Sequence, residues 1–262
     1  MVRPYAVKGL KRKKRDIEKE AAAGGEEEKE STVTESVGIH TLHPAAAVSG
    51  DGAKAGVVFV LEKASLEFAS VGKTYQLLNS DDHVNFFRKH NLDPAAYRPD
   101  ITHQALLAIL DSPLNKSGRI RALYVHTEKN VLIQVNPQVR LPRTYKRFSG
   151  VMLQVLQNKN IRAADGSGFL LRKVENPVTR HLPANSHRIG LSYSSQKLVQ
   201  MSNYVASISD DLNLVFVVGA MANGKIDTDY IDDLVAVSAY PLTAAYCIAR
   251  ICYALEQKWK IL

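Results

Sequence analysis

The segment from Gly219 to Lys225 has the residue types of a ligand-binding loop. It follows the apolar run 214–218, and glycines after such a strand are where α/β proteins bind ligands. The pattern is one residue short of a phosphate-binding loop, because Ile226 stands where a Ser or Thr would ligate Mg²⁺. The acidic residues between Ile226 and Asp233 would also repel a triphosphate. A nucleotide triphosphatase is therefore disfavoured, and taken alone Gly219 and Gly224 predict only a strand-to-loop turn.

Basic residues cluster in the middle of the chain. The whole chain has 34 Lys and Arg against 26 Asp and Glu, a net charge of +8, of which residues 1–30 contribute only +2. Residues 116–147 contribute +7, because they hold one acid, Glu128, and eight basic residues: Lys116, Arg119, Arg121, Lys129, Arg140, Arg143, Lys146 and Arg147. This stretch predicts a cationic surface, whose natural partners are polyanions.

Arginines of this stretch lie three and four residues apart around Pro142. Arg140, Arg143 and Arg147 can converge on neighbouring phosphates, whereas the alternative is a solvated charged face. The near absence of compensating acids favours RNA contact. The role of Arg98 is open between RNA contact and a structural role, because the nearby Asp100 can pair with it and also cap a helix.

Other chemistries find little support in the sequence. The eight histidines show no metal-ligand spacing, so no metal is expected. Cys247 and Cys252 lie five apart in one predicted helix, on different faces, which excludes a disulfide framework and fits a reducing compartment. Ser192 lacks a His/Asp partner pattern for nucleophilic hydrolysis. No apolar run approaches the roughly 20 residues that span a bilayer, so we expect no membrane partner.

Apolar patterning predicts the elements that position these residues. The runs 57–61 and 214–218 are typical of strands buried on both faces, which favours a parallel sheet. Residues 122–126 and 131–135 flank a four-residue loop and predict an antiparallel hairpin. We expect further strands over 169–174 and 234–237. The predicted helices run from a capping Asp100 to before Pro113, over 145–157, and from about Pro241, in the first turn, to about 257.

The first 55 residues have a different character from the remainder. They combine a basic cluster at 11–15, an Ala/Gly stretch and an acidic run, without a sustained apolar period, and are predicted to be disordered. The basic cluster is a candidate nuclear address or nucleic-acid arm, and a solvated charge run is the alternative. Residues 56–262 are predicted to form one domain, with a basic, hairpin-containing insertion at about 116–147.

Several long motifs carry a resemblance that covers about residues 56–262. They closely resemble the eukaryotic ribosome-biogenesis methyltransferases that modify N1 of a pseudouridine in small-subunit ribosomal RNA. The motifs are TYQLLNSDDH (74–83), RPDITHQ (98–104), LDSPLNK (110–116), VRLPRTYKRFSG (139–150), KVENPV (173–178), VVGAMANGK (217–225) and SAYPLTAA (238–245).

This resemblance implies a fold, a cofactor and partners. The fold is the α/β SPOUT class, a parallel sheet with a C-terminal trefoil knot, here with a β-rich RNA-binding insertion, and the active form is a homodimer. The cofactor is S-adenosylmethionine, and the partners are small-subunit ribosomal RNA and pre-ribosomal assembly factors in the nucleolus of the nucleus. The residues carried over for RNA are Arg98, Arg140, Arg143 and Arg147, and those for the cofactor are Leu191, which would precede the third strand, Gly219, Gly224, Val237, Ser238, Ala239, Tyr240, Pro241 and Leu242.

Methylation at N1 of pseudouridine requires the nitrogen to lose its proton. Asp111, at the end of a predicted helix, is our candidate catalytic carboxylate, and the alternative is that it accepts hydrogen bonds from its own turn. Lys225 is expected to be solvated or to stabilise its loop. The contrasting function is a non-catalytic assembly factor that binds ribosomal RNA with the same arginines.

Overall fold

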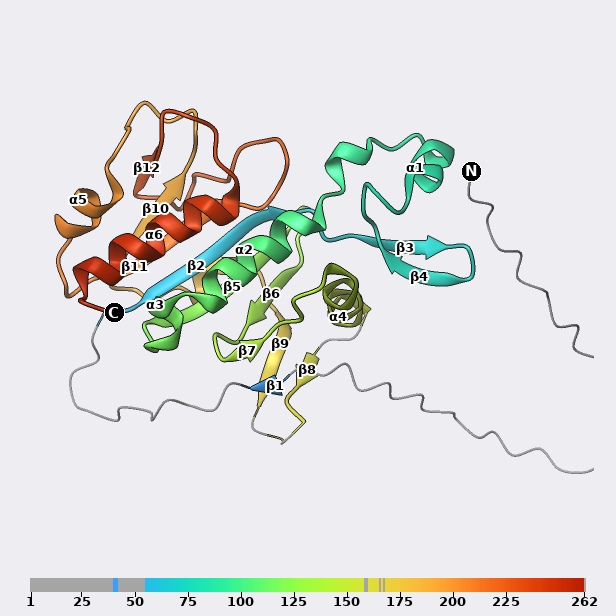
Figure 1. Ribbon diagram of the computed structural model, residues 1–262, viewed down its shortest axis with the longest axis horizontal. Helices are drawn as coiled ribbons and strands as arrows, with labels where there is room; N and C mark the ends of the chain where they lie inside the picture. Colours follow the sequence, from blue (N-terminus) through green and yellow to red (C-terminus); the bar gives the residue numbers. More distant parts are fainter. Residues whose placement is uncertain (1–39, 42–54, 158–159, 165, 167, 262) are drawn as a thin grey trace, which may run out of the picture. The chain divides into compact units, whose positions relative to one another are not determined.

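The computed structural model describes residues 40–41, 55–157, 160–164, 166 and 168–261. It contains an eight-stranded sheet in the order β12-β10-β11-β2-β5-β6-β9-β8 (Figure 1). Neighbouring strands are parallel from β12 to β5 and antiparallel from β5 to β8, so the fold is mixed α/β with a mostly parallel sheet. The strands are β2 (Val57–Ala64), β5 (Ile120–Thr127), β6 (Leu132–Val135), β8 (Asn160–Arg162), β9 (Phe169–Val174), β10 (Ser186–Leu191), β11 (Asn213–Gly219) and β12 (Asp233–Val235).

The two central strands, β2 and β11, are buried on both faces. The predicted runs 57–61 and 214–218 lie inside them, and each of these residues is 3% exposed or less. Phe59 and Phe216 are register partners whose ring centroids lie 5.8 Å apart. Alternate residues of these strands enter two apolar clusters, one on each side of the sheet, which is what a continuous apolar run requires.

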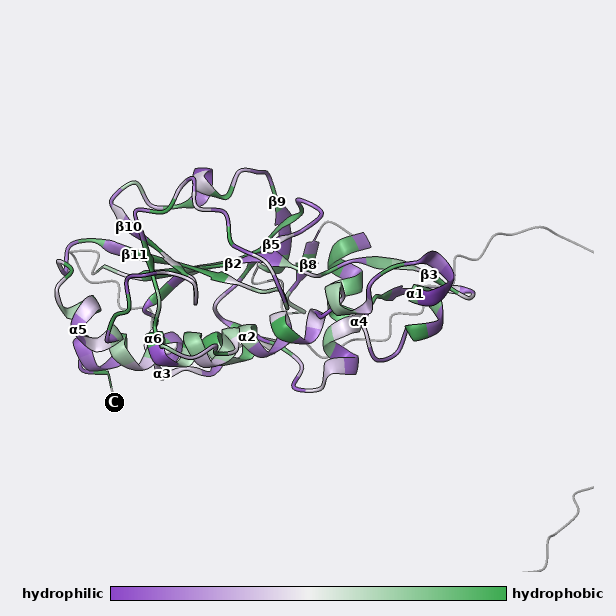
Figure 2. Cartoon of the chain, turned by 90° about the horizontal axis from the view of Figure 1, so that it is seen from above, coloured by the Kyte–Doolittle hydropathy of each residue, from purple (hydrophilic) through white to green (hydrophobic). Residues whose placement is uncertain are grey.

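Helices cover one face of the sheet, and connecting segments cover the other (Figure 2). The 3₁₀ helix η2 (Val178–His181) and the segment 220–232 are among the segments that cover this second face. Among the described residues, no helix is long and apolar enough to cross a membrane. The helices are α2 (Pro99–Asp111), α3 (Pro113–Lys116), α4 (Tyr145–Gln157), α5 (Met201–Ala206) and α6 (Ala244–Lys258).

Two of the predicted helix starts are wrong, whereas α4 has the predicted bounds. Asp100 does not cap α2: it lies in the first turn, and its carboxylate is occupied by Arg98, the residue at the N-cap position. Pro241 precedes α6 instead of lying in its first turn. The hydroxyl of Thr243 accepts a hydrogen bond from the backbone N–H of Tyr246 at 3.2 Å, which satisfies a free donor and sets the start of the helix there.

The predicted hairpin is confirmed, but it belongs to the main sheet. β5 pairs with β6 on one side and with β2 on the other, so these strands of the basic stretch are part of the main sheet. The strand predicted at 234–237 is shorter, because β12 ends at Val235. A segment that the sequence did not predict follows β2: the hairpin of β3 (Phe68–Val71) and β4 (Thr74–Leu77), then α1 (Val84–His90) and η1 (Pro94–Ala96).

The N-terminal 55 residues lie almost entirely outside the described part of the chain. The exceptions are Ala55 and the two-residue strand β1 (His40–Thr41), which pairs antiparallel with β7 (Val139–Arg140). The disorder predicted for the first 55 residues stays a prediction.

Phe216→Ala is expected to lower the free energy of unfolding by about 3–5 kcal/mol, because it removes a fully buried ring that packs on Phe59 and leaves a cavity. Urea denaturation followed by circular dichroism measures the change. As a control, Val84→Ala at the exposed start of α1 should stay within about 0.5 kcal/mol of the parent. Equal effects of the two variants would contradict the central position of β11.

Candidate functional site

The carboxyl ends of β10, β11 and β12 open into a cleft with a volume of about 550 Å³. Three segments form its walls: residues 191–193 after β10, residues 218–226 after β11, and residues 235–245 between β12 and the first turns of α6. The N-terminal end of α2 closes it through Arg98, Asp100 and Ile101. This volume is in the range of small-molecule and cofactor sites, and the place is where parallel sheets bind ligands.

Gly219, the last residue of β11, and Gly224, in the loop that follows, are glycines for different structural reasons. A Cβ on Gly219 would come within 2.8 Å of the Met221 sulfur, so a larger residue would require the Met221 side chain to move. Gly224 has φ +126°, a conformation that side chains disfavour. Gly224 therefore allows the loop a backbone conformation in which a side chain would be strained. Lys225, which was expected to be solvated, is exposed and also lines the cleft.

Most of the residues predicted to contact a cofactor come together in this cleft. Ala239 is the exception, because it is exposed and is not part of the lining. Leu191 is the last residue of β10, instead of preceding a strand, since β10 itself was not predicted. Sequence reasoning missed several other lining residues, among them Ser192, Tyr193, Met221 and Thr243. The predicted residues that line the cleft are Leu191, Gly219, Gly224, Val237, Ser238, Tyr240, Pro241 and Leu242.

Arg98 and Asp100 form a bidentate ion pair at the cleft. Nε and Nη2 of Arg98 donate to the two carboxylate oxygens of Asp100 at 2.8 and 2.7 Å. Hydrogen bonding from Arg98 lowers the pKa of Asp100 below its ordinary value, so this carboxylate is ionised at neutral pH. The pairing of Arg98 with Asp100 is confirmed, and the Arg98 side chain lies at the cleft and is 42% exposed. RNA contact by Arg98 stays a prediction.

The other predicted RNA-binding arginines lie away from the cleft lining. Arg140 ends β7, Arg147 is on the first turns of α4, and both are exposed. Arg143 donates hydrogen bonds to both carboxylate oxygens of Asp111, one of them 3.0 Å from Nη2. Asp111 ends α2, about 16 Å along the helix axis from Asp100. The structure therefore does not bring Asp111 to this cleft, and its role as the proton acceptor stays a prediction.

His103 links the cleft helix to the arginine segment. Its Nε2 lies 2.8 Å from the backbone oxygen of Pro142, and its ring stacks on Phe148 with centroids 4.3 Å apart. Burial lowers the pKa of His103, so the ring is neutral at neutral pH and Nε2 carries the hydrogen donated to Pro142. Phe148 is fully buried in the core, which fixes the ring against which His103 stacks.

Glu62 is a buried acid that the sequence analysis passed over. It is 2% exposed, and its carboxylate accepts hydrogen bonds from the hydroxyl of Tyr230 at 2.5 Å and from Nδ1 of His126 at 2.9 Å. Its backbone oxygen accepts from the N–H of Ala220 at 2.7 Å. Glu62 therefore fastens both ends of the segment 220–230, a wall of the cleft. An acid within the apolar strand β2 was the signal available in the sequence.

The side chains of the site suit binding and orientation without a metal. No group of three or more His, Cys, Asp or Glu side chains that could hold a metal ion occurs within the described ranges. Cys247 lines the cleft as a free thiol, and burial raises its pKa, which keeps it protonated and unreactive. The cleft thus offers a ligand apolar walls, the backbone groups of the surrounding loops and one ion pair.

Comparison with known proteins gives consistent matches over this domain. The family model described as EMG1/NEP1 methyltransferase matches residues 59–256. Mouse and human proteins named ribosomal RNA small subunit methyltransferase NEP1 are each 47% identical over 216 residues, which cover 81% of this chain and 87% of theirs. The crystal structure of Archaeoglobus fulgidus Nep1 bound to S-adenosylhomocysteine is similar in fold, with a TM-score of 0.64 at 23% identity over 79% of this chain and 99% of that one.

The Glu62–His126 contact predicts a pH dependence of stability. Hydrogen bonding to Glu62 raises the pKa of His126, so its stabilising contribution is complete below the unfolded value of about 6.5 and is lost as the pH rises through the higher folded value. Between pH 5.5 and pH 8.5, the free energy of unfolding should decrease more for the parent than for His126→Gln. Parallel pH profiles of the two proteins would show that the contact has no energetic weight.

Proposed function

Because the chain belongs to the EMG1/NEP1 methyltransferase family, we propose that it transfers the methyl group of S-adenosylmethionine to N1 of a pseudouridine in 18S-type small-subunit ribosomal RNA. The observation that carries this proposal is the cleft at the ends of β10, β11 and β12, walled by the glycine loop and the segment 235–245. The curated relatives, named as methyltransferases of small-subunit ribosomal RNA, support the substrate class.

The cleft suits an adenosyl cofactor. Leu191, Val237 and Leu242 supply apolar walls, and the loop after Gly219 brings backbone close to the cavity. Such a ligand has no phosphates, so the missing hydroxyl at Ile226 and the absence of a lysine–phosphate clamp are no obstacle. When bound, the cofactor supplies an electrophilic methyl group on sulfur, and the residues of this chain orient it and exclude water.

The acceptor base must be presented outside any stack, with N1 in line with the methyl group. We propose that Arg140, Arg143 and Arg147 hold the surrounding phosphates while Arg98 contacts RNA at the cleft. Among the described residues, Asp100 is the acidic side chain that lines the cleft, so we propose it, in place of Asp111, as the acceptor of the N1 proton. Asp111, paired with Arg143, is placed to orient that arginine toward RNA.

We extend the proposal to the trefoil knot of the SPOUT class. In support, the N–H of Ser192 bonds the oxygen of Val235 at 3.0 Å, while Ala236 exchanges 2.9 Å backbone hydrogen bonds with Lys197 and Val199. The C=O of one residue and the N–H of the next point to opposite sides of a strand. Two parts of one loop, 192 and 197–199, therefore flank the chain at 235–236, as a threaded segment requires.

The cellular setting is also part of the proposal. The protein would act as a homodimer on RNA in the nucleolus, within the nucleus, together with pre-ribosomal assembly factors. A protein that bound ribosomal RNA with these arginines but no cofactor would instead be a non-catalytic assembly factor. Cofactor binding therefore separates the two functions.

Gly219→Trp is expected to abolish binding of S-adenosylmethionine and methyl transfer together, because even a Cβ at this position meets Met221. Isothermal titration calorimetry measures binding, and mass spectrometry of small-subunit RNA from cells lacking the protein should show one methyl missing from one pseudouridine. Gly150→Trp on α4, where a Cβ meets open space, should retain cofactor binding. An intact protein that binds no cofactor would overturn the catalytic proposal.

Replacing Arg140 and Arg147 with Gln is expected to weaken RNA binding about tenfold and to reduce the slope of log K against log salt by roughly 1.4, or about 0.7 per lost phosphate contact on a single strand. Filter binding at several salt concentrations measures both quantities. Arg180→Gln, an exposed arginine on η2, is the matched control and should leave the slope unchanged. An unaltered slope in the double variant would rule out phosphate contacts by these arginines.

A further inference from the structure

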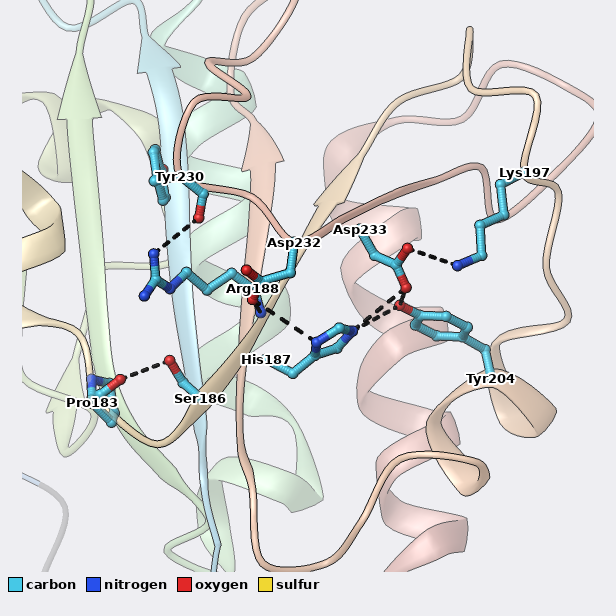
Figure 3. Close-up of polar contacts among 9 residues, drawn as sticks. All are labelled: Pro183, Ser186, His187, Arg188, Lys197, Tyr204, Tyr230, Asp232 and Asp233. Atoms are coloured by element: carbon cyan, nitrogen blue, oxygen red, sulfur yellow. Dashed lines mark hydrogen bonds and ion pairs between the residues drawn. The ribbon is translucent and has the colours of Figure 1, made fainter.

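A cluster of polar side chains surrounds Asp233, the first residue of β12 (Figure 3). Oδ1 of Asp233 lies 2.7 Å from Nζ of Lys197, and Oδ2 accepts a 2.7 Å hydrogen bond from the hydroxyl of Tyr204. Nε2 of His187 on β10 lies 3.5 Å from the same Oδ2. One carboxylate thus connects β12, β10, α5 and the loop after β10.

The charge states of the cluster favour these contacts at neutral pH. Hydrogen bonds from Lys197 and then Tyr204 lower the pKa of Asp233, which keeps the carboxylate ionised. Burial and Asp233 itself raise the pKa of Tyr204, so its hydroxyl remains a donor. Since the Asp233 side chain is only 28% exposed and has several partners, the cluster differs from an isolated surface ion pair, which contributes little.

The elements that the cluster connects are two walls of the cleft. Lys197 belongs to the loop that begins with the lining residues Ser192 and Tyr193, and Asp233 opens the strand that leads to the lining segment 235–245. The two walls have little regular structure of their own, because β12 has three residues and the backbone of the loop bonds this part of the chain at Val235 and Ala236. Side-chain contacts with Asp233 add to these backbone hydrogen bonds and attach the loop to the start of the strand.

We propose that Asp233, through Lys197 and Tyr204, is a positioning residue that holds the loop after β10 against β12 and so preorganises the cleft for its cofactor. This inference rests on the proposed function, because it takes the cleft to bind S-adenosylmethionine. None of the three side chains lines the cleft, so each acts through the backbone that it fixes. Preorganised walls strengthen binding because less conformational freedom is lost when the ligand enters.

The test uses the full chain and S-adenosylhomocysteine as the probe in calorimetric titrations. Lys197→Met removes the cation from Asp233, Lys197→Arg retains it, and Tyr204→Phe removes the hydroxyl. Lys258→Met is the matched control, since Lys258 donates to the backbone oxygens of Val205, in α5, and Ile208, after it, and lies outside the cleft lining. Thermal unfolding and RNA affinity are measured for every variant.

We expect Lys197→Met and Tyr204→Phe to weaken binding of the probe about tenfold, and Lys197→Arg to restore most of it. RNA affinity should stay unchanged. Lys258→Met should lower the unfolding temperature without weakening binding of the probe, which separates positioning from general stability. Probe affinities within twofold of the parent in both Lys197→Met and Tyr204→Phe would overturn the inference. A parent protein that bound no probe would overturn the proposed function, and the inference with it.

Discussion

The parallel pairing of β2 with β11 is the constraint on which the remaining structure depends. Both strands are apolar on both faces, so each face of the sheet must be covered. Helices cover one side, and η2 with the segment 220–232 covers the other. Parallel strands also end at one edge, which gathers Gly219, Glu62 and Leu191 at the same end of the sheet. The cleft is a consequence of that burial.

Helix α2 connects the two halves of the proposed chemistry. Asp100 near its start pairs with Arg98 at the cleft, and Asp111 at its end pairs with Arg143 in the basic segment. Between them, His103 donates to the backbone of Pro142. One rigid element thus relates the position of the cofactor cleft to the position of the arginines. A methyl transfer that depends on alignment of donor and acceptor benefits from such a fixed spacing.

Two carboxylates fasten the loops that surround the cleft, and they use the same combination of partners. Glu62 accepts hydrogen bonds from Tyr230 and His126, and Asp233 accepts one from Tyr204 beside Lys197. In each case a protonated tyrosine donates a hydrogen bond to the carboxylate, and a basic side chain balances the negative charge. Loops without regular structure are the least stable parts of a fold, so contacts of this kind decide how ordered the walls of a cleft are.

The sequence by itself determined the central strands, the bounds of α4, the hairpin of β5 and β6 and the concentration of positive charge, because each depends on local pattern. It also indicated part of the cleft lining, through motifs that resemble a known family. Only the tertiary structure decided that Asp100 lies at the cleft while Asp111 lies at the far end of α2, and that Glu62 and Asp233 hold the walls. These contacts join residues far apart in the chain, such as Glu62 and Tyr230, and their pairing depends on strand order and register, which local pattern does not contain.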